Sequence, residues 1–183
     1  MKKLKIFYPD NSIKIHKSTK VLFILISLIL ITYFSKKMFP KNIENLELLY
    51  FVMVVIFTVY CLIYVININL FRYETENGTY SGYLIIETEK IICGENTYLI
   101  NDIEKISILN YSIRGKFNGN ISALNPKKSN GLKNYIEIHH KNQIYKYHFL
   151  QTKTENMKMF ENELRIYYEK GILGKQNYEN ITK

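Results

Sequence analysis

The strongest constraint on the fold of this chain is a pair of apolar segments near its start. The first runs from Val21 to Phe34 and the second from Leu48 to Ile66, and neither contains a charged residue. An α-helix rises about 1.5 Å per residue, and the hydrocarbon core of a bilayer is about 30 Å thick. The second segment is therefore long enough to cross a membrane alone. The first reaches that length when Met38 extends it and flanking lysines reach the headgroups.

The connection between the two segments predicts that they form a tight antiparallel hairpin. It reads SKKMFPKNIEN, and Pro40 within it must end a helix. We therefore predict transmembrane helices over 18–38 and 46–71, joined by a loop over 39–45. A signal peptide is disfavoured because no small-residue cleavage site follows the first segment. A hairpin buried in a water-soluble core is disfavoured because the rest of the chain is too small to cover two wholly apolar helices.

The positive charge of the chain is concentrated before the first apolar segment. The formal net charge is +9, and up to the first apolar segment a single acid, Asp10, stands beside Lys2, Lys3, Lys5, Lys14, Lys17 and Lys20. Basic flanks stay on the cytoplasmic side of a membrane. We therefore expect residues 1–17 to be a basic cytoplasmic segment and the hairpin to return the chain to the cytoplasm, although the lysines of the connection oppose this orientation.

The predicted location is thus the cytoplasmic (inner) membrane, multi-pass, with both termini in the cytoplasm. Nucleic-acid binding is disfavoured because it needs a basic face on a folded domain. The middle of each apolar segment also lacks ionisable residues, which usually mark ion or proton pathways. A passive anchor is therefore favoured over a transporter, and assembly of the spans into a homo-oligomer stays open.

Short alternating strands follow the second apolar segment. After a polar connector over 72–79, apolar and polar residues alternate between turn residues, which is typical of an antiparallel sheet or barrel. We interpret the polar segment 112–133 as a mobile loop, and we place a seventh strand near Tyr73 or within 112–131. The six strands with a clear pattern are expected over 82–88, 91–93, 97–100, 103–111, 134–140 and 144–150.

The final segment changes to a helical period. Thr152 and Glu155 have the spacing of a capping box. An apolar stripe then follows at helical spacing: Met157, Phe160 and Leu164. The sequence therefore predicts one amphipathic helix that closes the end of a curled sheet, followed by a polar tail over 173–183.

The apolar cadence of the strand region carries a resemblance to a known family. The segments GYLIIETEKIIC, from Gly82, and YLINDIEKISI, from Tyr98, resemble the bacterial pleckstrin-homology-like (PH-like) domain. Many such bacterial proteins also carry two N-terminal transmembrane helices. The resemblance implies a membrane α-helical hairpin and an all-β PH-like barrel over 80–172, with six to seven antiparallel strands capped by one C-terminal α-helix. Barrels of this kind bind phosphoinositides or peptides.

No catalytic constellation stands out in the sequence. It has no glycine-rich phosphate loop, no His-Glu-x-x-His motif and no nucleophile elbow. Cys61 and Cys93 fall within apolar patterns. His139, His140 and His148 do not converge on a metal ion, because neighbours on a strand point to opposite faces. We expect no catalytic residue, no metal site, no cofactor and no enzyme activity.

One polar segment is the candidate binding site. Between Ser112 and Lys133 the chain has no acid and carries these basic residues: Arg114, Lys116, Lys127, Lys128 and Lys133. Each cation near an anionic membrane surface contributes about 1 kcal/mol. Weak affinity suffices for a tethered domain, because the contact is effectively intramolecular. The alternative is a solvated loop that keeps the domain soluble.

The sequence thus favours a non-enzymatic, membrane-anchored binding or scaffold module at the cytoplasmic face of the membrane. Its expected partner is an anionic lipid headgroup or a protein. Two further interpretations stay open. The chain also resembles membrane effectors of bacterial antiphage defence, in which a β-barrel binds a cyclic nucleotide and the spans assemble to disrupt the membrane. A membrane immunity protein that neutralises a toxin has the same architecture.

Overall fold

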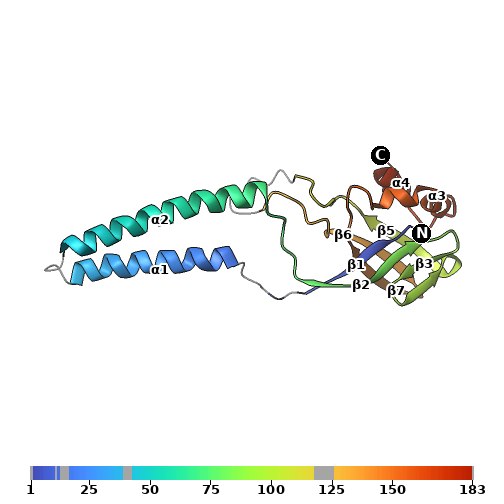
Figure 1. Ribbon diagram of the computed structural model, residues 1–183. Coiled ribbons are helices and arrows are strands. Elements are labelled where there is room, and N and C mark those ends of the chain that lie inside the picture. Colours follow the sequence, from blue (N-terminus) through green and yellow to red (C-terminus); the bar gives the residue numbers. More distant parts are fainter. Residues whose placement is uncertain (1, 11, 13–16, 39–42, 118–125, 183) are drawn as a thin grey trace. The chain divides into compact units, whose positions relative to one another are not determined.

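The computed structural model describes residues 2–10, 12, 17–38, 43–117 and 126–182, which fall into two units (Figure 1). One unit, the helical hairpin, lies within residues 13–72. The other, the sheet domain, comprises residues 1–12, 73–119 and 127–183. The chain therefore contributes to the sheet domain twice, once before and once after the hairpin.

Two long helices, α1 (Lys17–Met38) and α2 (Ile43–Leu70), make up the helical hairpin. They run antiparallel and lie side by side (Figure 1). The Tyr60 hydroxyl of α2 donates a hydrogen bond to the Ser18 carbonyl oxygen of α1 at 2.8 Å. The start of α1 is thereby held against the second half of α2.

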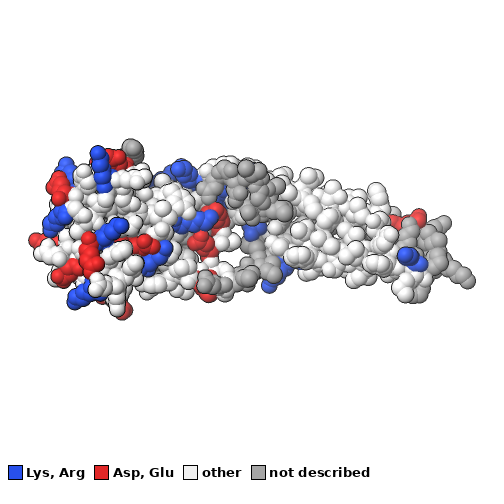
Figure 2. Space-filling view, turned by 180° about the vertical axis from the view of Figure 1, so that it is seen from behind, with Lys and Arg blue, Asp and Glu red and all other residues white. Residues whose placement is uncertain are grey.

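Both helices are long and apolar enough to cross a membrane, over Lys17–Ser35 and Glu47–Leu70. Their large apolar side chains face outward; Phe51, for example, is 65% exposed. On the face seen in Figure 2, charged side chains gather on the sheet domain and are nearly absent from the helices. A helix that is apolar on all sides is not a water-exposed surface helix. The two apolar helices expected over 18–38 and 46–71 are therefore present.

Seven antiparallel strands form one sheet, in the order β4-β3-β2-β1-β7-β6-β5. Six of them fall where the alternation predicts strands. The strands are β1 (Leu4–Pro9), β2 (Gly78–Ile86), β3 (Lys90–Cys93), β4 (Asn96–Leu99), β5 (Ile103–Leu109), β6 (Asn134–His140) and β7 (Gln143–Phe149).

The seventh strand, β1, lies inside the sheet between β2 and β7. Leu4 pairs with Leu84 of β2, and Ile6 pairs with Phe149 of β7. Near Tyr73 and in the described parts of 112–131 the chain forms only isolated bridges, and residues 118–125 lie outside the described residues. The seventh strand is therefore β1 and not one near Tyr73. It is formed inside the basic segment, whose lysines dominate the composition and hide the alternation of Leu4, Lys5 and Ile6.

The sheet has two edges, β4 and β5, so within the described residues it is open and does not close into a barrel. Tyr98 of β4 reaches Tyr147 of β7, and their hydroxyl oxygens lie 2.6 Å apart. This buried hydrogen bond connects the β4 end of the sheet to a distant strand. The structure thus confirms a seven-stranded antiparallel sheet, while the PH-like identity of the domain stays a prediction.

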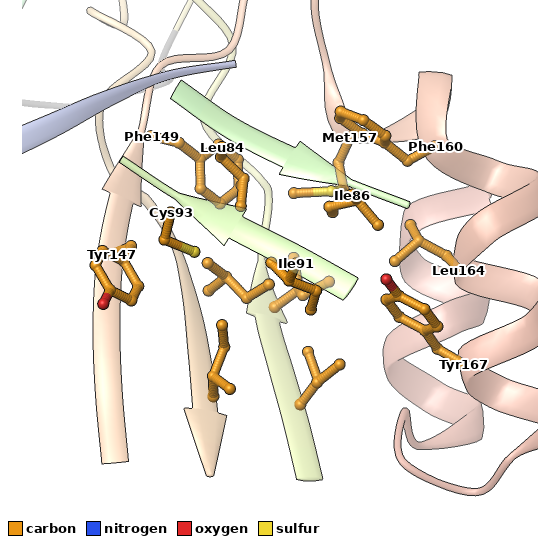
Figure 3. Close-up of a cluster of buried hydrophobic side chains, with 14 of the residues drawn as sticks. Leu84, Ile86, Ile91, Cys93, Tyr147, Phe149, Met157, Phe160, Leu164 and Tyr167 are labelled. Carbon is orange, nitrogen blue, oxygen red and sulfur yellow. The ribbon is translucent and has the colours of Figure 1, made fainter. Parts of the chain in front are cut away.

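The main apolar core lies between the sheet and α3 (Glu161–Glu169), which follows the short 3-10 helix η3 (Met157–Phe160). A smaller buried cluster holds Phe7, Leu132 and Leu150. Figure 3 shows Ile86 and Ile91 of the sheet facing Leu164 of α3. Each fully buried aliphatic side chain of this kind stabilises the fold by about 1.5–3 kcal/mol. The amphipathic helix expected after the strands is therefore present and packs on the core.

The start of that helix differs from the expected one. Asn156 is the N-cap of η3, and its Oδ1 accepts a hydrogen bond from the Lys158 backbone N–H at 3.1 Å. The Thr152 hydroxyl accepts from the Glu155 backbone N–H at 2.9 Å, before the helical residues begin. The capping-box prediction was wrong because this Thr-x-x-Glu contact stabilises a preceding turn and not the first helical turn.

A further helix, α4 (Lys175–Thr182), lies where a polar tail over 173–183 is expected. Asn177 Oδ1 accepts from the Ile108 backbone N–H at 3.0 Å, and its Nδ2 donates to the Ile108 carbonyl at 2.7 Å. The side-chain amide thus takes the place of a neighbouring strand at the β5 edge. Covered edges of this kind do not pair with other chains.

Candidate functional site

The polar segment that holds the five candidate cations is built as two arms that pair with each other. The first arm is Ser112–Phe117 and the second is Pro126–Lys133; residues 118–125 lie outside the described part of the chain. The Ser112 and Ser129 hydroxyl oxygens lie 2.7 Å apart, and both side chains are buried. The mobile-loop interpretation therefore does not apply to the two arms.

Asn134, the first residue of β6, fixes both arms to the sheet. Its side chain is fully buried. Its Oδ1 accepts from the Ser112 N–H at 2.9 Å, and its Nδ2 donates to the Ser112 carbonyl at 2.7 Å and to the Gly131 carbonyl at 2.8 Å. Gly131 has a φ of +79°, and a Cβ there would lie 2.4 Å from the Gln151 carbonyl oxygen, so only glycine fits.

We expect Asn134→Ala to lower the free energy of unfolding by about 3 kcal/mol. The change leaves three buried backbone groups of Ser112 and Gly131 without partners, and each costs about 1–3 kcal/mol, part of which local relaxation recovers. Asn96→Ala is the matched control, since within the described residues the Asn96 side chain makes one hydrogen bond, to the Tyr147 hydroxyl at 3.1 Å. Urea denaturation of the two variants measures the difference. Equal losses would show that Asn134 does not fix the arms.

Three of the five candidate cations lie over two exposed aromatic rings. The Arg114 guanidinium carbon is 5.4 Å from the centroid of the Tyr73 ring, and Lys128 Nζ is 6.0 Å from the same centroid. Lys127 Nζ is 5.9 Å from the centroid of the Phe117 ring. Both aromatic residues are exposed, Tyr73 to 41% and Phe117 to 58%. These five residues form what we call the aromatic–basic surface.

Backbone pairing explains why these residues meet. The Glu74 N–H donates to the Lys128 carbonyl at 2.8 Å, and Tyr73 and Lys128 form an isolated parallel bridge. Phe117 forms an antiparallel bridge with the same Lys128. Lys128 therefore pairs on one side with the segment Tyr73–Glu74, which follows α2, and on the other side with Phe117 of the first arm. Cations that are distant in sequence are brought to one place by this pairing.

The other two candidate cations lie elsewhere. Lys133 Nζ is 2.8 Å from Glu74 Oε1, and this hydrogen bond is the main reason why the pKa of the Lys133 ammonium is raised. Its charge is therefore largely balanced. Lys116 lines a separate hollow of about 640 Å³ together with Lys158. The structure thus places Arg114, Lys127 and Lys128 over the two rings, whereas Lys133 pairs with Glu74 and Lys116 lines another hollow.

Two of the three clustered histidines, His140 and His148, lie beside aromatic rings. The His140 ring lies 5.5 Å from the Tyr98 ring, and the His148 ring lies 5.8 Å from the Tyr135 ring. Burial, and then the nearby Lys146 charge, lower the pKa of His148. Among the described residues, no three His, Cys, Asp or Glu side chains are grouped as a metal site would require.

Sequence reasoning found the cations of this surface but missed its aromatic half. Tyr73 and Phe117 each stand beside a basic residue, Arg72 and Lys116, in otherwise polar stretches. The sequence signal for this aromatic half is an isolated aromatic residue next to a cation in a segment that follows a membrane span. Such residues are informative because aromatic rings favour the bilayer interface.

Comparisons of this chain with protein-family models, with curated proteins and with solved structures find no match. The chain is thus described by its own architecture: a seven-stranded antiparallel sheet domain, two apolar helices inserted between β1 and β2, and an aromatic–basic surface that begins directly after α2.

Proposed function

We propose that this chain is a non-enzymatic, membrane-anchored binding module whose aromatic–basic surface contacts anionic lipid headgroups. The hairpin is the anchor, and the sheet domain is a PH-like domain at the cytoplasmic face of the membrane. The observation that carries the proposal is the gathering of Arg114, Lys127 and Lys128 over the exposed rings of Tyr73 and Phe117.

The position of Tyr73 in the chain supports contact with headgroups. Leu70, the last residue of α2, is followed by Phe71, Arg72 and then Tyr73. An extended chain advances at most about 3.5 Å per residue, so Tyr73 lies within about 11 Å of the end of α2. The headgroup layer beside the hydrocarbon core is about 5–8 Å thick. A surface built around Tyr73 therefore has the headgroups within reach when α2 spans the bilayer.

The chemistry of the surface also suits a membrane interface. Each unpaired cation near an anionic surface contributes about 1 kcal/mol, and aromatic rings are favoured at the headgroup level. No ion pair of Arg114, Lys127 or Lys128 is found within the described residues. Three free cations give about 3 kcal/mol, which is ample for a domain that is already tethered.

The fold supports the PH-like part of the proposal. Seven antiparallel strands form one sheet, and a C-terminal amphipathic helix, α3, covers its main apolar core. The lysine-rich start of the chain favours the cytoplasmic side of the membrane. The chain leaves the sheet domain after β1, forms the helical hairpin and returns into β2. These two strands pair with each other, with Pro9 of β1 opposite Gly78 of β2.

We expect the triple variant Arg114→Ser, Lys127→Ser, Lys128→Ser to bind anionic vesicles roughly 100-fold more weakly than the wild type, since about 3 kcal/mol is lost. The test uses a linked sheet domain, in which residues 2–12 are joined by a short linker to residues 73–183. Flotation with phosphatidylglycerol vesicles and with phosphatidylcholine vesicles measures the binding.

The control carries the same change in net charge at exposed lysines far from Tyr73 in the chain: Lys105→Ser, Lys153→Ser and Lys158→Ser. It should lose much less affinity than the triple variant. Equal losses in the two variants would mean that net charge alone drives binding and that the aromatic–basic surface has no special role. Absence of wild-type binding to anionic vesicles would contradict the proposed function itself.

A further inference from the structure

The hollow that contains Lys116 lies within the sheet domain, beside the β5 edge of the sheet and α4. Its volume is about 640 Å³, and residues within 108–116, 151–158 and 177–181 form its wall. We call this space the β5–α4 hollow. Sites for small ligands in proteins have volumes of about 300–1,000 Å³. The hollow is therefore large enough to hold a small organic molecule.

Hydrogen bonds of two wall residues hold the segments around this hollow in place. The buried Gln151 side chain donates from Nε2 to the Asn110 carbonyl at 3.1 Å, and its Oε1 accepts from the Met157 N–H at 2.8 Å. The Asn177 amide connects α4 to both backbone groups of Ile108. A site that is formed before the ligand arrives spends less binding free energy on ordering its wall.

The charged residues of the wall are all cationic. Lys116 comes from the first arm and Lys158 from η3, and no Asp or Glu is among the described residues that line the hollow. Neither lysine forms an ion pair within the described part of the chain. A phosphate monoester carries a charge of about −1.5 to −2 at pH 7. Two lysine ammonium groups therefore match the charge of one such group.

The rest of the wall combines apolar, aromatic and amide groups. Ile108 and Ile181 are only 3% and 4% exposed, whereas Tyr111 is 58% exposed. The side-chain amides of Asn110 and Asn180 make no hydrogen bond with the residues that the structure describes. Nucleic-acid bases stack on aromatic rings, and side-chain amides form hydrogen bonds with the edges of bases. These groups therefore suit a planar heterocycle with hydrogen-bonding edges.

We propose that the β5–α4 hollow binds a nucleoside monophosphate. Lys116 and Lys158 donate to the phosphate oxygens, the Tyr111 ring stacks on the base, and the Asn180 amide contacts the edge of the base. This inference goes beyond the proposed function and does not depend on it, because the ligand is soluble. The hollow and the aromatic–basic surface also have no cation in common.

The composition of the wall separates this ligand from simpler ones. Inorganic phosphate meets the two ammonium groups but leaves the ring and the amides without a partner. A nucleoside without phosphate leaves both positive charges unbalanced. A cationic ligand would be repelled by two lysines without an acid beside them. A nucleoside monophosphate uses both parts of the wall, and hydrogen bonds from a lysine ammonium to phosphate are about twice as strong as neutral ones.

The test is isothermal titration calorimetry of the purified full-length chain in detergent with AMP, GMP, CMP and UMP. We expect saturable binding of at least one of these four nucleotides, with one ligand per chain. The matching nucleoside and inorganic phosphate should each bind at least tenfold more weakly than that nucleotide. Lys116→Ser, Lys158→Ser and Tyr111→Ser should each weaken its binding about tenfold, because each removes one contact to the phosphate or the base.

Lys153→Ser is the matched control, because Lys153 is an exposed lysine near Lys158 in the chain that does not line the hollow. It should bind the nucleotide as the wild type does. No saturable binding of any of the four nucleotides, or binding that survives both lysine changes, would overturn the inference. Binding of inositol phosphate alone would also overturn it, because the cations would then serve a lipid headgroup. Vesicle flotation is measured separately, so this inference can fail while the proposed function stands.

Discussion

A chain that starts at residue 73 does not fold, whereas the linked sheet domain folds cooperatively and stays soluble in water. This is the expected result of removing or keeping β1. Leu4, Ile6 and Phe7 are at most 2% exposed, and β1 separates β2 from β7. Burial of three such side chains contributes about 6 kcal/mol. The total stability of a domain is only about 5–15 kcal/mol.

The linker is feasible because the two strand ends are adjacent. Pro9 pairs with Gly78, and the Asp10 N–H donates to the Asn77 carbonyl at 2.7 Å. A few residues of linker therefore replace the whole helical hairpin and leave an ordinary β-hairpin between β1 and β2. Far-UV circular dichroism and urea denaturation distinguish the folded chain from the unfolded one.

Two substitutions in the linked sheet domain test the position of β1 more finely. Ile6→Asp should abolish cooperative unfolding, because it places a carboxylate in the core. Lys5→Asp, on the exposed face of the same strand, should change the stability by less than about 1 kcal/mol. A cooperative transition in the chain from residue 73 that matches the linked domain would contradict the central place of β1.

The parts of the fold that sequence reasoning predicted are those with a strong local period. The apolar runs around α1 and α2, the alternation of β6 and β7, and the stripe of α3 each carry their own signal. β1 has the same alternation, but it is short and surrounded by lysines, so its charge suggested a membrane flank. Its partners, Leu84 and Phe149, are distant in sequence, and only the tertiary fold brings them to it.

The candidate site was predicted in part for a similar reason. The five cations share one acid-free stretch, so composition identifies them. Which of them act together depends on contacts that composition does not contain. The bridge between Tyr73 and Lys128 gathers one set, while Glu74 takes Lys133 into an ion pair. The order of residues in the sequence does not show which cations gather at the rings and which one is paired with an acid.

The pairing of β1 with β2 determines on which side of the membrane the two strands lie. β1 precedes the helical hairpin and β2 follows it, yet the two strands pair along their length. Residues that form one sheet cannot be separated by a bilayer. A hairpin of two spans meets this condition, whereas a single span would place β1 and β2 on opposite sides. We therefore expect residue 5 and residue 153 to face the same compartment.

The measurement that tests this account most directly is cysteine labelling of the full-length chain in sealed membrane vesicles of known orientation. Single cysteines are introduced as Lys5→Cys, Lys41→Cys or Lys153→Cys in a Cys61→Ala background. Cys93 remains, because it is fully buried and burial raises its pKa to about 12, so the parent should not react. A membrane-impermeant maleimide then reports which face each position occupies.

We expect positions 5 and 153 to react from the cytoplasmic face and position 41, between the two spans, to react only from the opposite face. Detergent should make all three positions reactive, which confirms that each site is chemically competent. Labelling of positions 5 and 153 from opposite faces would contradict a sheet domain built from both ends of a membrane hairpin. Labelling of all three from one face would show that the helices do not span the bilayer.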